Sequence, residues 1–151
     1  MLVRDLMQTE VATLKAGDTL GLADDIMQLG RIRHLPVVSA DNKIVGIISQ
    51  RDLFRAAISS VLHMRKATER DWLAKIPVHD VMTAHVISVG PDCTVREAIE
   101  IMIKKRIGCL PVTDNGVLIG LVSENDFLRL LDRVLELPDV KSQLPELRFP
   151  D

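Results

Sequence analysis

The sequence has few aromatic residues, and its net charge is close to zero. Aromatic side chains make up 3% of the 151 residues and tyrosine is absent, so the aromatic platform on which single-stranded nucleic acids stack is not expected. The formal net charge of -2 provides no basic surface for a phosphate backbone. We therefore expect no nucleic-acid partner.

Cysteines and long apolar runs are also scarce. Cys93 and Cys109 are the two cysteines, and their spacing matches neither a metal site nor a disulfide framework. Arg4 and Asp5 interrupt any apolar start that a signal peptide would need. No apolar run approaches the roughly 18 residues that cross a bilayer. These features predict a cytoplasmic protein with no membrane segment and no bound metal.

What the chain does contain is one unit written twice. Gly46–Asp52 reads Gly-Ile-Ile-Ser-Gln-Arg-Asp, and Gly120–Asp126 reads Gly-Leu-Val-Ser-Glu-Asn-Asp. Aligning residues 5–39 with residues 80–114 gives 12 identities in 35 positions. A repeat of this kind indicates two units that bury their apolar faces together.

Each unit is predicted to run strand, helix, strand, strand, helix. In the first unit the strands are expected at residues 9–14, 35–39 and 44–49, with helices from Thr19 to a closing Gly30 and from residue 50 to 62. In the second unit they are expected at residues 86–89, 110–113 and 117–123, with helices from the capping box of Thr94 and Glu97 to residue 105 and from residue 124 to 135.

Four segments follow from this pattern. Residues 1–62 form the first repeat and residues 78–135 the second. Residues 63–77 form a linker that contains Trp72 and is expected to be helical. Residues 136–151 contain three prolines and are expected to form an extended tail.

The repeated motifs resemble the cystathionine-beta-synthase (CBS) domain. They are an Asp-x-Met opening, Ile-x-x-Leu-Pro-Val, and Gly followed by two apolar residues and Ser-x-x-Asp before a helix. The resemblance implies a stand-alone CBS pair (Bateman module) of α+β class, with two β-α-β-β-α repeats packed about a pseudo-two-fold axis. It also implies homodimers, and clefts that bind AMP, ADP, ATP, NAD or S-adenosylmethionine as effectors.

The residues themselves suggest how such a ligand would bind. A serine at the end of a strand and before a helix lies near unpaired backbone N–H groups that favour a phosphate. An aspartate three residues later can accept hydrogen bonds from ribose hydroxyls. The same Ser-x-x-Asp spacing also makes a helix capping box that needs no ligand, and both interpretations can hold together.

The family's geometry implies two unequal clefts, each shared between the repeats. The stronger phosphate binder is expected to contain Ala12, Thr13, Arg33, His34, Leu35, Pro36, Ser123 and Asp126. The weaker one is expected to contain Ser49, Asp52, Ile87, Ser88, Cys109, Leu110 and Pro111. The difference rests on Arg33 and His34, which offer donors to a phosphate. Loss of AMP binding in Asp126→Ala and not in Asp52→Ala is the predicted pattern.

No set of residues supports catalysis, a catalytic cofactor or a metal centre, so the expected function is regulatory. Ligand occupancy would stabilise one arrangement of the repeats, and an effector protein would sense it. The alternative is a dimerising interaction module with empty clefts, which uses the Trp72 helix and the proline-containing tail as its binding surface.

Overall fold

The computed structural model describes residues 1–63 and 69–143, which form two similar halves. The first half contains the helix α1 (Leu20–Gly30), the strands β1 (His34–Val38) and β2 (Ile44–Ser49), and the helices α2 (Gln50–His63) and α3 (Glu69–Leu73). The second half contains α4 (Val95–Lys105), β3 (Cys109–Asp114), β4 (Val117–Ser123), α5 (Glu124–Leu135) and α6 (Pro138–Gln143). Short 3-10 helices occupy Val3–Asp5 and Val78–Asp80.

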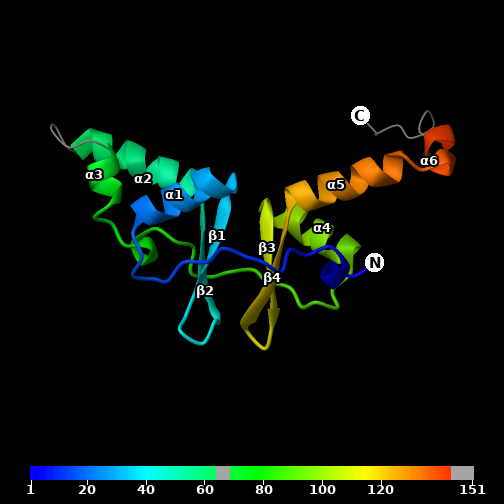
Figure 1. The fold of residues 1–151 in the computed structure, drawn as a ribbon, viewed down its shortest axis with the longest axis horizontal. Helices are drawn as coiled ribbons and strands as arrows, with labels where there is room; N and C mark the ends of the chain where they lie inside the picture. Colours follow the sequence, from blue (N-terminus) through cyan, green and yellow to red (C-terminus); the bar gives the residue numbers. More distant parts are fainter. Residues whose placement is uncertain (64–68, 144–151) are drawn as a thin grey trace.

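The two β-hairpins lie side by side at the centre of the molecule, with α1–α3 beyond one hairpin and α4–α6 beyond the other (Figure 1). Each hairpin is an antiparallel two-stranded sheet. Their turns are joined because the N–H of Ile44 donates to Gly116 at 3.0 Å and the N–H of Leu118 donates to Asn42 at 2.9 Å. This mixture of helices and small sheets confirms the predicted α+β class.

Local capping signals set the starts of α1 and α4. The Oγ1 of Thr19 accepts from the N–H of Leu22 at 3.2 Å, and Thr94 forms the predicted capping box with Glu97. The ends differ from the prediction. Gly30 is the last residue of α1, and the left-handed position after it is filled by Arg31, with a φ of 51°.

The predicted strands at residues 9–14 and 86–89 are wrong. Each segment makes a single parallel bridge, Leu14 with Val37 and Val89 with Val112. The next step of each ladder toward the N-terminus would need an N–H from Pro36 or Pro111, and proline has none. Each repeat is therefore built as helix, strand, strand, helix, preceded by an extended segment.

The opening segment of each sequence repeat packs on the hairpin of the other. Gln8 and Leu121 exchange two backbone hydrogen bonds of 2.9 Å, and Thr83 and Ile47 exchange bonds of 2.9 and 3.0 Å. In Figure 1 the start of the chain accordingly lies beside α4. A Cβ at Gly46 would collide with the side chain of Met82. The repeated glycine thus makes room for a methionine from the opposite repeat.

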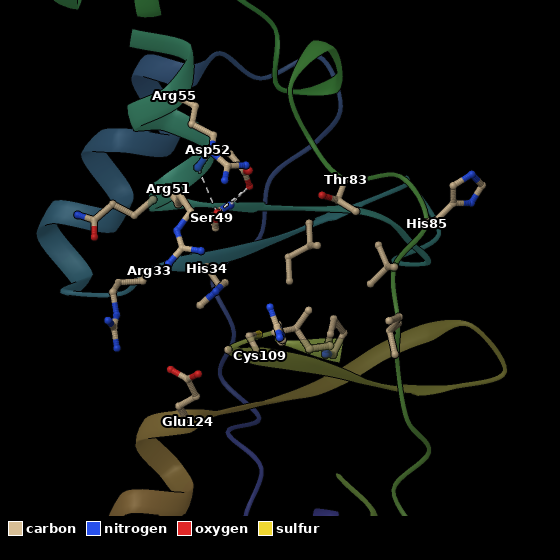
Figure 2. Close-up of a pocket in the computed structure, with 18 of the residues that line it drawn as sticks. Arg33, His34, Ser49, Arg51, Asp52, Arg55, Thr83, His85, Cys109 and Glu124 are labelled. Atoms are coloured by element: carbon tan, nitrogen blue, oxygen red, sulfur yellow. Dashed lines mark hydrogen bonds between the residues drawn. The ribbon is translucent and has the colours of Figure 1, made fainter. Parts of the chain in front are cut away.

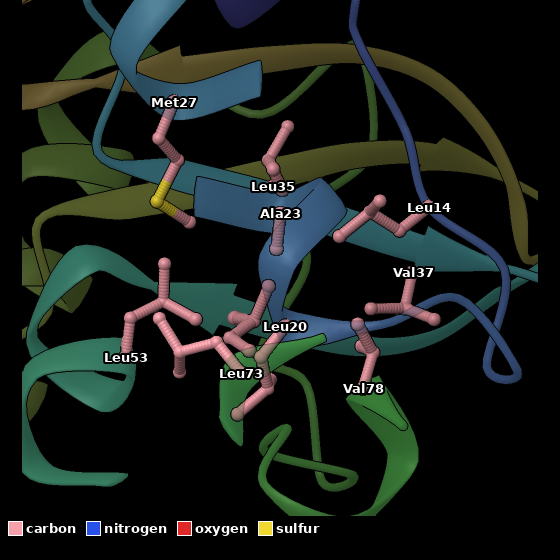
Figure 3. Packing of buried hydrophobic residues seen from close by; sticks show 10 residues of the cluster. Leu14, Leu20, Ala23, Met27, Leu35, Val37, Leu53, Leu73 and Val78 are labelled. Carbon is pink, nitrogen blue, oxygen red and sulfur yellow. The ribbon is translucent and has the colours of Figure 1, made fainter. Parts of the chain in front are cut away.

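The two hydrophobic cores show the same exchange. Val78, from the opening of the second repeat, packs in the first core with Leu14 and Val37 (Figure 3). Val3, from the opening of the first repeat, packs in the second core with Val89 and Val112. Both valines are fully buried, so neither half completes its core without a segment from the other sequence repeat.

The linker and the tail also contribute helices. Leu73 of α3 is buried in the first core and Trp72 packs against it, so this helix covers a core. The tail was expected to be extended, but it begins with α6, whose first residue is Pro138. Proline is favoured at the first position of a helix. Residues 64–68 and 144–151, which belong to the predicted linker and tail, lie outside the described residues.

Candidate functional site

A pocket of about 800 Å³ opens between the two halves. One wall is formed by the end of β2 and the first turn of α2, and the other by the extended segment of the second repeat and the start of β3. Nineteen residues line it: Arg33, His34, Ile47, Ser49, Gln50, Arg51, Asp52, Phe54, Arg55, Thr83, His85, Val86, Ile87, Arg106, Ile107, Gly108, Cys109, Pro111 and Glu124.

The pocket brings Arg33 and His34 together with Ser49 and Asp52 (Figure 2). From the sequence, these two basic residues were predicted to share a cleft with Asp126. In the structure they line a pocket with Asp52, and Asp126 does not line this pocket. The hairpin register explains the difference, because His34 lies directly opposite Ser49 in the antiparallel pair. The N–H of Gln50 also donates to the carbonyl of Arg33 at 2.8 Å.

Asp52 uses one carboxylate oxygen for its helix and leaves the other open. Its Oδ2 accepts from the N–H and the Oγ of Ser49, both at 2.7 Å. The N–H of Asp52 in turn donates to the Oγ of Ser49 at 3.2 Å, so the capping box is confirmed. Within residues 1–63 and 69–143, the Oδ1 accepts no hydrogen bond. One aspartate can therefore serve a helix cap and a ligand together.

Asp126 forms the same cap, but both of its oxygens are occupied. Its Oδ2 accepts from the N–H and the Oγ of Ser123 at 2.8 and 2.7 Å. Its Oδ1 accepts from the Nε2 of Gln8 at 2.8 Å. The residue is 5% exposed. The two aspartates are thus equivalent in sequence and different in their hydrogen bonding.

Positive charge predominates around the open aspartate. Four arginines, Arg33, Arg51, Arg55 and Arg106, line the pocket, against the carboxylates of Asp52 and Glu124. None of these arginines forms an ion pair with a residue in the described part of the chain. Their guanidinium groups therefore offer hydrogen-bond donors for an anion with several oxygens.

His34 lies at the centre of these charges. Burial and the neighbouring charge of Arg33 lower the pKa of His34, and the carboxylates of Glu124 and Asp52 oppose them only in part. The imidazole is therefore neutral near pH 7. Gly108 packs closely against both side chains, because a Cβ there would lie 3.3 Å from the ring of His34 and 3.2 Å from the carboxyl carbon of Glu124.

Comparison with known proteins agrees with the repeat. The sequence profile of the CBS domain matches residues 3–59 and 78–133. The chain belongs to the CBS domain family. A CBS domain-containing protein of Dictyostelium discoideum is 34% identical over 137 residues, which are 90% of this chain and 94% of that protein. The inosine-5′-monophosphate dehydrogenase of Methanocaldococcus jannaschii is 36% identical over 80% of this chain.

Some relatives are much longer than this CBS pair. The chain spans 21% of that dehydrogenase and 24% of the homoserine O-acetyltransferase of Methanohalobium evestigatum, to which it is 33% identical. Among solved structures, a Vibrio cholerae protein named for acetoin utilization (AcuB) has a TM-score of 0.81 and 36% identity, and the match covers 92% of this chain and 97% of that one.

A second solved structure contains ligands. The CBS domain pair of protein MJ0100 was crystallised in complex with 5′-methylthioadenosine and S-adenosyl-L-methionine. Its TM-score against this chain is 0.76 and the identity is 27%, over 89% of this chain and 98% of that one.

The predicted site residues divide into two groups in the CBS pair. The pocket contains Arg33, His34, Ser49, Asp52, Ile87, Cys109 and Pro111. It does not contain Ala12, Thr13, Leu35, Pro36, Ser88, Leu110, Ser123 or Asp126. Leu35 and Leu110 are fully buried in the two cores. Ser88 instead accepts a hydrogen bond from the hydroxyl of Thr113 at 3.3 Å.

The sequence interpretation missed several residues that line the pocket: Arg51, Arg55, Thr83, His85, Arg106 and Glu124. A helical signal was present for two of them. Arg51 and Arg55 are four residues apart and flank Asp52 in the first turns of α2, so they project from one side of the helix. Thr83 and His85 had no such signal, because their position depends on the segment exchange between the repeats.

Cys109, which lines the pocket, is not an activated nucleophile. The residue is 4% exposed, and burial, reinforced by the nearby charge of Asp126, raises the pKa of its thiol to about 12. It is therefore a neutral thiol at physiological pH. No group of three or more metal-ligating side chains is present in residues 1–63 and 69–143, and no helix there is long and apolar enough to cross a membrane.

Proposed function

We propose that the protein is a regulatory CBS pair that binds a phosphorylated adenosine nucleotide in the pocket of Asp52. The observation that carries this proposal is the open Oδ1 of Asp52 beside four arginines that form no ion pair within the described residues. Adenosine-type ligands in the CBS pair of MJ0100 support the ligand class. The volume of about 800 Å³ suits a ligand of this size.

Each part of a nucleotide has a matching region of the pocket. Ile47, Val86, Ile87 and Pro111 give an apolar slot for the adenine ring. The Oδ1 of Asp52 would accept from the ribose hydroxyls, which makes a charge-assisted hydrogen bond. The phosphates would meet the arginines and the N-terminus of α2, where the helix dipole favours negative charge.

Binding would be communicated by linkage between the two halves. The pocket walls come from both sequence repeats, so a ligand that contacts both stabilises one relative arrangement of them. A partner with different affinities for the bound and unbound arrangements would then sense the nucleotide. No step of this mechanism requires turnover of the ligand.

We also propose that the chain forms homodimers through the outer face of α4 and α5. Ile103, Leu128 and Leu131 are 73%, 62% and 50% exposed. They line an apolar groove of about 870 Å³. An exposed apolar face of this kind is typical of an interaction surface. A dimer with empty clefts is the alternative function, and nucleotide binding distinguishes the two.

Calorimetric titration of nucleotide-free protein with AMP, ATP, adenosine and S-adenosylmethionine tests the proposal. We expect AMP and ATP to bind, with ATP the tighter, because added phosphate oxygens engage more of the arginines. Asp52→Asn should weaken binding about tenfold or more, since it removes a charge-assisted acceptor. Asp126→Asn is the matched control and should have little effect. Binding of none of these compounds would favour the ligand-free interaction module.

A further inference from the structure

Residues 8 and 83 are equivalent in the repeat but carry side chains of different length. The backbone of Gln8 pairs with Leu121, and the backbone of Thr83 pairs with Ile47, in the same two-bond pattern. Each residue therefore reaches the opposite repeat at the same place relative to its Ser-x-x-Asp motif. Gln8 and Thr83 thus have the same backbone pairing and differ in their side chains.

The two side chains differ in their contact with the aspartate of the opposite repeat. The amide of Gln8 donates from Nε2 to the Oδ1 of Asp126 at 2.8 Å. Thr83 makes no hydrogen bond to Asp52 in the described chain, and the short hydroxyl lines the pocket wall (Figure 2). The amide thus occupies the carboxylate oxygen to which a ribose hydroxyl would donate at the other site.

A second equivalent position differs in the same direction. Glu10 stands where the second repeat has His85, so a carboxylate replaces a residue that lines the pocket. A carboxylate at this place disfavours a phosphate by like-charge repulsion. The site of Asp126 would therefore be more acidic than the pocket of Asp52.

We propose that the side-chain amide of Gln8 takes the place of a ligand at Asp126 and so closes one of the two equivalent sites. Each chain then binds a single nucleotide, at Asp52. The inference rests on the proposed nucleotide binding and adds its stoichiometry and the residue that sets it. Gln8 is exposed at the surface, so its side chain can be exchanged without opening a core.

Reciprocal exchange of the two residues tests the proposal by calorimetry with ATP. The wild-type chain is expected to bind one ATP, and Asp52→Asn to weaken this binding. Gln8→Thr, alone or with Glu10→His, is expected to raise the stoichiometry to two. The added site should disappear when Asp126→Asn is combined with it. Thr83→Gln should close the original site and weaken ATP binding about tenfold or more.

Several results would overturn the proposal. A wild-type stoichiometry of two would show that Gln8 does not close the second site. A stoichiometry of one in both Gln8→Thr and Gln8→Thr/Glu10→His, with an unchanged melting temperature, would show that other residues close it. Either result would leave nucleotide binding at Asp52 intact. Absence of ATP binding in the wild type and in every variant would instead remove the proposed function, and this inference with it.

Discussion

At the scale of single residues, we expect His34 to make the pocket sensitive to pH. Its pKa is lowered, chiefly by burial and by Arg33, so the folded, ligand-free protein holds it neutral while an unfolded histidine with a pKa near 6.5 is partly charged. The unfolded state therefore binds more protons as the pH falls below about 6.5. The contribution of His34 to the free energy of unfolding is therefore fully present above about pH 6.5. It is lost as the pH falls from there through the lowered pKa of the folded state.

A bound phosphate should reverse this preference. Negative charge next to His34 favours the imidazolium, so nucleotide binding takes up a proton and strengthens as the pH falls from about 7.5 to about 6.5. The measurement is the dissociation constant of AMP across that range. We expect the wild-type protein to gain affinity relative to His34→Gln at the lower pH.

Adenosine provides the control for this prediction, because it has no phosphate to interact with the imidazolium. Comparison with His34→Gln also removes the effect of the phosphate group's own titration near pH 6. Parallel pH profiles for AMP in the wild type and His34→Gln would contradict a role for His34 at the phosphate.

At the scale of elements, the fold depends on the fit between each hairpin and the methionine of the opposite repeat. Gly46→Ala places a methyl group against Met82. Overpacking of this kind costs about 1–3 kcal/mol, and we expect the free energy of unfolding in urea to fall by that amount. Gly90→Ala is the matched control, because a Cβ there has no neighbour within 4 Å. Equal stabilities of the two variants would show that the methionine moves aside freely.

The elements show which structural features were predictable from the sequence. The helices α1 and α4 were predictable because Thr19 and Thr94 cap them through local hydrogen bonds. The hairpins were predictable from nearly continuous apolar runs separated by turn residues. The absence of a strand at residues 9–14 was not predictable. The β-branched residues there favour a strand locally, but the ladder would need an N–H from Pro36, which is distant in sequence and has none.

The candidate site divides in the same way. The Ser-x-x-Asp motifs identified Asp52 and Asp126 as candidate ligand residues. What separates them is a contact between residues 118 positions apart, the amide of Gln8 and the carboxylate of Asp126. The grouping of His34 with Asp52 likewise follows from strand register. No local pattern contains either piece of information.

At the scale of the whole molecule, the exchanged segments couple the two halves. Val3 is fully buried in the second core although it belongs to the first repeat. Val3→Ala should lower the free energy of unfolding by about 1–3 kcal/mol, because a buried apolar group is lost and a cavity remains. Hydrogen exchange should report the loss of protection first in β3 and β4.

Val78→Ala is the reciprocal variant, since this valine completes the first core. It should reduce protection first in β1 and β2 by the same reasoning. If each valine instead weakened the half to which it belongs in sequence, the exchange of segments would have no energetic importance.

The exchange also bears on how such a chain can arise by duplication. A single repeat would carry an opening segment and a hairpin that meet their counterparts only on a second molecule, so its two copies would have to associate to complete their cores. Fusion of the copies turns that encounter into an intramolecular one, at an effective concentration of the order of millimolar. Once joined, the copies are free to diverge. Glutamine in one and threonine in the other is the kind of change that two identical subunits could never make separately.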